Sequence, residues 1–212
     1  TDAQSENIFL VSDGVFSMDG DAAELSALAR IATSSNTTLM IDDAHGVGVL
    51  GAKGLGSVQA SQLSAEQVPI LIIPAGKALG GQGALILSKQ IIIQHLIETA
   101  RSYLFSTAPA PAMAAALSHA LKCLQTQPEH HARLQENIAH FTQLANAAAL
   151  PVLPSQSAIQ PLMVGTNERA LWLAEYMLQK GFWLSAIRPP TVPAGKARLR
   201  ITLTALHDTA QI

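Results

Sequence analysis

Two polar groups that could do chemistry follow apolar runs of the chain. Asp42, Asp43 and His45 come directly after the run 38–41. Ligands of open α/β sheets bind beyond the carboxyl ends of strands, so this position suits a binding site. A carboxylate at the end of a buried strand needs a cationic partner, such as arginine, lysine, a metal ion or a protonated ring nitrogen.

Spacing alone favours a simpler interpretation of this first group. The two carboxylates would cap backbone amides of the next turn, and His45 would be an ordinary loop histidine. A metal site is less favoured, because Asp-Asp-x-His offers hard ligands with no second cluster to complete a coordination shell.

Lys77 forms the second group, between Gly76 and Ala78 and just after the run 68–73. Small neighbours can leave its ammonium desolvated, which favours the neutral amine and makes this lysine a candidate for a Schiff base. The alternative is a solvated loop lysine. The stretch is not a P-loop, because alanine follows the lysine where serine or threonine is required.

Arginines near the end of the chain form a third group. Arg188 precedes Pro-Pro-Thr-Val-Pro, a stiff loop that would hold its neighbours in place. Arg198 and Arg200 alternate on a predicted strand, so both should point to one face. An arginine there can bind a carboxylate through two hydrogen bonds, whereas the alternative is a surface ion pair worth under about 1 kcal/mol.

The elements that must position these groups alternate between strands and helices. Asp21 and Glu24 predict the capped start of a helix with the apolar face Leu25, Leu28, Ile31 and Ala32. Strands and helices in alternation favour an α/β layer with helices on a mostly parallel sheet. Apolar runs predict the strands at 7–12, 38–41, 68–73 and 83–87.

The last third of the chain has a different pattern. Helix is predicted from 111 to 150 with a break near Pro128, and the Pro- and Ser-containing segment 151–157 follows. Beyond it we expect a small α+β unit with strands at 159–164, 182–187 and 198–203 and a helix at 168–180. The chain is therefore expected to divide into a sheet-containing domain, 1–125, and a small α+β domain, 126–212.

Composition excludes several classes of partner. Only 13% of residues are charged, against about 25% in typical soluble domains. The net charge of −2 gives no electrostatic reason to expect nucleic acid or an anionic membrane. No apolar run reaches the roughly 18 residues of a spanning helix, and no signal peptide is recognisable. The single cysteine, Cys123, indicates a reducing compartment such as the cytoplasm.

Taken together, the motifs resemble the α-oxoamine synthases, which are pyridoxal 5′-phosphate (PLP) enzymes of fold type I. The resemblance predicts part of that family's mostly parallel large-domain sheet with helices, plus a small C-terminal α+β domain. It covers nearly the whole chain, in order. The segments that carry it are 12–21 (SDGVFSMDGD), 41–51 (IDDAHGVGVLG), 76–80 (GKALG) and 157–195, which contains SAIQPL and IRPPTVPAG.

The resemblance also implies roles for individual residues. Lys77 would hold the cofactor, Asp42 would pair with its ring nitrogen and His45 would hydrogen-bond its ring hydroxyl. Ser17 would lie beside the cofactor, and Thr107 would reach the phosphate bound by a partner subunit, which implies a homodimer with shared sites. The substrate residues would be Arg200, on the amino-acid carboxylate, with Thr191 and Arg188.

The implied reaction is that of the biotin-pathway members of this family. L-Alanine would condense with a pimeloyl thioester of coenzyme A or a carrier protein, giving 8-amino-7-oxononanoate, carbon dioxide and the free thiol. One alternative is another α-oxoamine synthase that uses glycine or a different acyl thioester. A second is a non-catalytic chain that lacks a complete cofactor site.

The chain departs from the family pattern in three places. Pro74 stands where a threonine hydroxyl usually binds the phosphate, and proline offers neither hydroxyl nor amide donor. Asp13 stands where glutamate is expected. The family's phosphate loop and its ring-stacking histidine belong to a half that precedes this sequence, so we expect little or no turnover from the 212 residues alone. A covering partner or missing half would also explain the low charge content.

Overall fold

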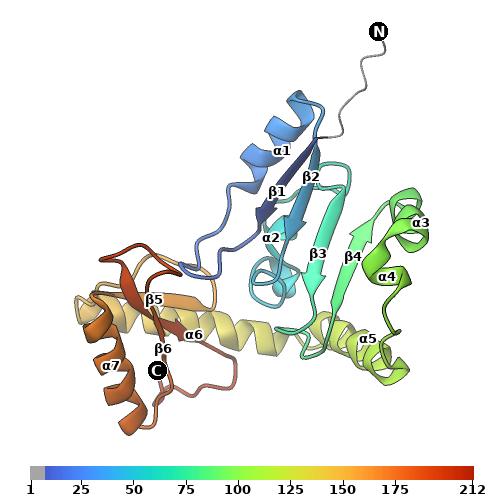
Figure 1. Ribbon diagram of the computed structural model, residues 1–212. Helices are drawn as coiled ribbons and strands as arrows, with labels where there is room; N and C mark the ends of the chain where they lie inside the picture. The colour runs from blue at the N-terminus through green and yellow to red at the C-terminus, as the bar shows by residue number, and fades with distance from the viewer. Residues whose placement is uncertain (1–7) are drawn as a thin grey trace. The chain divides into compact units, whose positions relative to one another are not determined.

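Four strands form a sheet in the order β1-β2-β3-β4 (Figure 1). β1 pairs parallel with β2 and β2 parallel with β3, whereas β4 runs antiparallel to β3. The predicted mostly parallel sheet is thus confirmed. The computed structural model describes residues 8–212, so Asn7, placed by the sequence in the first strand, lies outside the described residues. The strands are β1 (Phe9–Asp13), β2 (Thr38–Asp42), β3 (Ile70–Pro74) and β4 (Ala84–Ser88).

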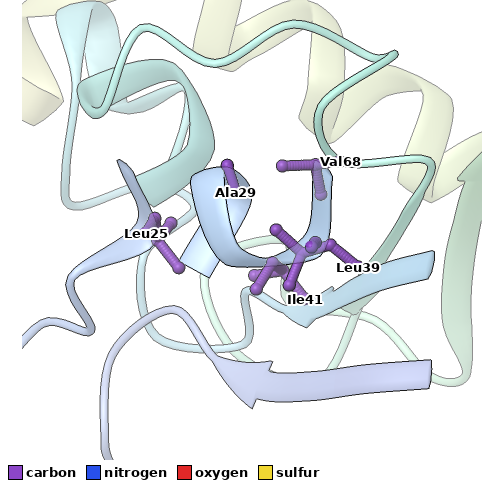
Figure 2. Close-up of a cluster of buried hydrophobic side chains, with 6 residues drawn as sticks. Leu25, Ala29, Leu39, Ile41 and Val68 are labelled. Carbon is purple, nitrogen blue, oxygen red and sulfur yellow. The ribbon is translucent and has the colours of Figure 1, made fainter. Parts of the chain in front are cut away.

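Helix α1 (Leu25–Ser34) covers one face of this sheet. Leu25 and Ala29 on the helix pack with Leu39 and Ile41 on β2, and Val68 completes the cluster (Figure 2). Leu39 and Ile41 are fully buried, because alternate residues of a strand point to the same face. This packing fixes β2, the strand that ends at Asp42.

The start of α1 differs from the prediction. The helix begins at Leu25 with Glu24 at its N-cap and no side-chain hydrogen bond to the cap, so the capping box predicted from Asp21 and Glu24 is wrong. Ile31 is 54% exposed, and Ala29 takes its place on the buried face. Asp21 is instead used by the loop before the helix, where its carbonyl accepts a hydrogen bond from the Phe16 amide.

Further helices follow the strands of this first unit. Leu117 of α5 packs with Val47, Ile73 and Leu79, so this helix covers the turns that follow β2 and β3. The sequence analysis predicted no element between 87 and 111, where the structure has two helices. The elements are η1 (Ala52–Gly54), α2 (Ser57–Ala60), α3 (Gln90–Thr99), α4 (Arg101–Leu104) and α5 (Pro111–Thr126).

The second unit comprises Glu129–Ile212 together with the excursion Phe16–Ala22, and the first unit comprises the remainder. Its antiparallel sheet has the order β5-β7-β6. Ala170 of α7 packs on Ala197 and Leu199 of β7, which leaves the alternate residues of β7 on the opposite face. The elements are α6 (Pro128–Ala147), β5 (Ile159–Gly165), α7 (Asn167–Gln179), β6 (Ser185–Ile187) and β7 (Ala197–Thr202).

These elements confirm the predicted α+β character of this part of the chain. β6 is shorter than its predicted range of 182–187, because Phe182 and Trp183 are exposed and precede the pairing with β7. Within residues 8–212, no helix is both long enough and apolar enough to cross a membrane.

Truncation of Leu39 should destabilise the first unit. Leu39→Ala removes a fully buried side chain and leaves a cavity under α1, so the free energy of unfolding should fall by about 2–5 kcal/mol in urea titrations. Ile91→Ala is the control, because Ile91 is 76% exposed and its loss should change stability by less than about 0.5 kcal/mol. Equal effects of the two changes would contradict the packing described for β2.

Candidate functional site

The carboxyl ends of three parallel strands bring the predicted chemical groups of the first unit to one sheet edge. β1 ends at Asp13, which lies beside Asp42 at the end of β2. β3 is the neighbour of β2 and ends at Pro74, three residues before Lys77. Parallel strands share the direction of their carboxyl ends, so two carboxylates and an amine gather at this edge.

Electrostatics confirm that these three groups lie within range of one another. Partial burial and the neighbouring Asp42 carboxylate raise the pKa of Asp13, while the positive charge of Lys77 acts in the opposite direction. Lys77 itself is exposed in the described chain, so Gly76 and Ala78 do not desolvate it as their small size suggested. The lysine is therefore open to a ligand at this edge.

Asp42 and His45 lie in and just after the end of β2. The Ala44 amide donates to Asp42 Oδ1 at 2.9 Å, so this carboxylate does cap the following turn, as spacing favoured. His45 is half-buried in the same turn. This hydrogen bond occupies one oxygen of Asp42 and restrains the orientation of its carboxylate.

Asp43 is fully buried and organises the loops around the edge. The Ser57 amide at the start of α2 donates to Asp43 Oδ2 at 2.8 Å. Burial raises the pKa of Asp43, against the lowering effect of the Ser57 hydroxyl and amide. A Cβ at Gly14, Gly46 or Gly56 would collide with this carboxylate, so three glycines make room for it. This geometry gives Asp43 and Gly46 a structural role.

A further close approach joins the loop after β2 to the loop that carries Lys77. Gly48 has a φ of +82°, and a Cβ there would overlap the Cβ of Ala78. Only glycine combines this backbone conformation with this contact at no steric cost. Gly48 therefore allows the turn of His45 and the turn of Lys77 to pack together.

In the second unit, β7 presents two arginines with different surroundings. Arg198 is buried and forms an ion pair with Asp19, and its Nε donates to the Lys196 carbonyl at 3.0 Å. Arg200 is half-buried, and its Nε is buried without a hydrogen-bond partner among the described residues. Burial lowers the pKa of both guanidinium groups, so an anionic partner is favoured at each.

The remaining predicted site residues lie in loops. Arg188 and Thr191 are exposed and close a tight turn, in which the Thr191 amide donates to the Arg188 carbonyl at 3.1 Å. Ser17 is half-buried in the excursion Phe16–Ala22 of the second unit. Thr107 is exposed in the segment between α4 and α5. The structure thus groups Lys77 and Asp42 at the sheet edge of the first unit, and Arg188, Thr191 and Arg200 near the β6–β7 pair of the second.

Sequence reasoning missed the role of Asp19. In Met18-Asp19-Gly20 it looked like an ordinary turn residue, and its ion pair with Arg198 joins positions far apart in the sequence. The available signal was Arg198 itself, because a buried arginine on a strand requires a counter-charge.

Comparison with known proteins agrees with this geometry. A family model described as aminotransferase class I and II matches residues 1–212, and the chain belongs to this family. The predicted resemblance to the α-oxoamine synthases is also confirmed, since the similar proteins include several members of that group.

Three of these proteins define the similarity. An 8-amino-7-oxononanoate synthase of Serratia proteamaculans is 48% identical over 97% of this chain and 53% of its own length. The crystal structure of an 8-amino-7-oxononanoate synthase from Francisella tularensis is 32% identical, with a TM-score of 0.85 over 99% of this chain and 61% of its own. A serine palmitoyltransferase from S. paucimobilis with a bound PLP-myriocin aldimine is 27% identical, with a TM-score of 0.89 over 96% and 51%. The chain spans about half the length of the curated relatives it matches.

The buried carboxylate of Asp43 should give the protein a specific pH dependence. Its folded-state pKa lies above the unfolded value of 3.8, so the stability linked to it is fully present below the unfolded pKa and is lost as pH rises through the folded pKa. Asp43→Asn removes this loss. The stability of the original chain relative to the variant, measured by urea titration from about pH 3 upward, should therefore fall with rising pH. Parallel stability curves would contradict the raised pKa.

Proposed function

We propose that this chain carries the lysine, acidic and arginine side chains of a PLP-dependent acyltransferase of biotin biosynthesis. The reaction condenses L-alanine with a pimeloyl thioester, of coenzyme A or a carrier protein, to give 8-amino-7-oxononanoate, carbon dioxide and the free thiol. The observation that carries the proposal is the sheet edge where Asp13, Asp42 and Lys77 meet. The names of the relatives at 44–49% identity support the choice of substrates.

The donor set of the first unit fits PLP. An exposed amine can bond covalently to an aldehyde, and Lys77 offers one. A carboxylate held rigid at a strand end can keep a pyridine nitrogen protonated, and Asp42 offers one through its bond to Ala44. His45, in the turn that packs against the lysine loop through Gly48, would hydrogen-bond the ring hydroxyl. The resemblance also assigns Ser17, which belongs to the second unit, a hydroxyl role beside the ring.

When bound, PLP supplies an electron sink for the pair of electrons left when a bond to Cα of the amino acid breaks. Asp42 would strengthen that sink by holding a proton on the ring nitrogen. Lys77 would act as the general base that removes the Cα proton of L-alanine. Asp13 adds negative charge beside Asp42, which favours protonation of the group that Asp42 contacts.

The second unit supplies the groups that would hold the amino acid. Arg200 has a buried Nε–H without a partner, and a bidentate bond to the L-alanine carboxylate would satisfy it. Arg188 and Thr191 lie in the tight turn after β6 and would line the substrate site. Holding the carboxylate in place orients the Cα–H bond for proton removal.

The proposed protein works as a homodimer in the cytoplasm. Thr107 is exposed in the described chain and would donate its hydroxyl to the phosphate bound by a partner subunit. The single cysteine fits a reducing compartment. The domain division at 125/126 that the sequence suggested stays a proposal, and it differs from the two compact units, which change after Pro128 and place Phe16–Ala22 with the second.

A second candidate within the same family has support from the fold. The serine palmitoyltransferase structures superpose with TM-scores up to 0.92, so the backbone does not separate their substrates from those proposed. Product formation by the full-length protein from L-alanine with pimeloyl-coenzyme A, compared with L-serine and palmitoyl-coenzyme A, would separate the two reactions. Product from the second pair alone would overturn the proposed substrates.

Lys77 should be the residue that bonds to the cofactor. With added PLP the chain should show a visible absorption band distinct from that of free PLP, and borohydride reduction should leave the cofactor mass on the peptide that contains Lys77. Lys77→Ala should lack both. Lys122→Ala, which removes an exposed lysine of α5, is the control and should keep both. A reduced cofactor found on another lysine would overturn the assignment.

Pro74→Thr should increase affinity for PLP. The change restores a hydroxyl and an amide donor at the end of β3, and one hydrogen bond to a charged phosphate is worth about 1.5–3 kcal/mol, or roughly tenfold or more in the dissociation constant. Pro74→Val is the matched control, because it restores the amide without the hydroxyl. Absorbance titrations with PLP measure both, and equal constants for the two variants would show that the hydroxyl contributes nothing.

A further inference from the structure

The Asp19–Arg198 ion pair lies at β7, on the same face of the strand as Arg200. Arg198 and Arg200 are two residues apart on β7, so both side chains lie on the face opposite α7. Both guanidinium groups are desolvated. The two arginines on this face are distinguished by their partners.

Arg198 has two partners within the protein. Its Nη1 meets the Asp19 carboxylate and its Nε donates to the Lys196 carbonyl, while only 5% of the side chain is exposed. Arg200 has no ion pair among the described residues, and its buried Nε lacks a hydrogen-bond partner. The charge of Arg198 is thus neutralised by Asp19, whereas the charge of Arg200 is available to a ligand.

The backbone next to Asp19 is held firmly in this unit. Ser155 Oγ donates to the Gly20 carbonyl at 2.8 Å and lies 2.9 Å from Ser157 Oγ. Gln160, also buried, donates to the Ser157 carbonyl at 2.8 Å. Gly20 has a φ of +68°, and a Cβ there would lie 2.7 Å from Ser155 Oγ. These contacts fix the backbone at Gly20, and the neighbouring Asp19 carboxylate is thereby positioned beside Arg198.

We propose that Asp19 is a specificity-determining residue, which neutralises Arg198 so that this face of β7 binds one carboxylate and discriminates against dicarboxylates. This inference rests on the proposed role of Arg200 in holding the carboxylate of L-alanine. A second carboxylate on a ligand would find no free cation at Arg198 and would face the negative charge of Asp19. Discrimination of this kind depends on a repulsive element as well as an attractive one.

The test compares L-alanine with L-aspartate, which differs by one added carboxylate. Dissociation constants of both are measured by NMR titration of this chain and of Asp19→Asn, with thermal unfolding to verify the fold. The freed Arg198 should lower the ratio of the L-aspartate constant to the L-alanine constant by about tenfold. The double variant Asp19→Asn/Arg198→Met should restore the original ratio. A folded Asp19→Asn variant with an unchanged ratio would show that the pair is structural only.

A second comparison keeps the inference testable if Asp19→Asn does not fold, since that variant leaves a buried charge without compensation. In Arg198→Met the carboxylate of Asp19 remains as an unpaired anion on the side of Arg200. It should weaken binding of L-alanine relative to the double variant, in which both charges are absent. Equal constants in these two proteins would overturn the inference.

Failure of the proposed function has a different signature. If the original chain binds L-alanine no better than Arg200→Met does, the carboxylate role of Arg200 is wrong and the inference falls with it. If Arg200→Met loses L-alanine binding and the Asp19 variants leave the selectivity ratio unchanged, the proposed function stands and only the role of Asp19 is rejected.

Discussion

The buried carboxylate of Asp43 is the interaction on which the site of the first unit depends. It receives the Ser57 amide at the start of α2, and glycines 14, 46 and 56 come from three separate turns that close around it. A buried charge without partners is strongly unfavourable, and the hydrogen bond from the Ser57 amide together with the space left by the three glycines allows this carboxylate to be buried. The positions of Asp42 and His45 depend on this arrangement, because both residues lie in the same turn as Asp43.

The fold was predictable where hydrophobic pattern and burial coincide. β2 and β3 are short apolar runs buried by helices, and their predicted ranges differ from the observed strands by only one or two residues. The start of α1 was not predictable, because Asp21 satisfies the pattern of an N-cap while its carbonyl is used by a loop of the second unit. Local signals cannot show that the excursion Phe16–Ala22 is held in the second unit by Ser155, which lies 135 positions from Gly20 along the chain.

The candidate site was predictable to a different extent in the two units. The ends of strands can be recognised in the sequence, so Asp42 and Lys77 could each be placed just after a strand before the structure was known. The exposure of Lys77 could not be predicted, because the small size of Gly76 and Ala78 does not show whether other parts of the chain cover the lysine. On β7 the alternation of Arg198 and Arg200 was evident, yet their unequal surroundings were not, since the counter-charge comes from Asp19.

The excursion Phe16–Ala22 also bears on how the chain could be divided. The second unit is discontinuous in sequence, because the polypeptide leaves the first unit after Val15 and returns to it at Ala23. A cut after Pro128 would therefore separate Arg198 from its counter-ion and remove Gly20 from the serines that hold it. Residues 129–212 do not form the complete α+β unit. A recombined, truncated or split protein that uses them alone would lack the segment Phe16–Ala22, which belongs to the same unit.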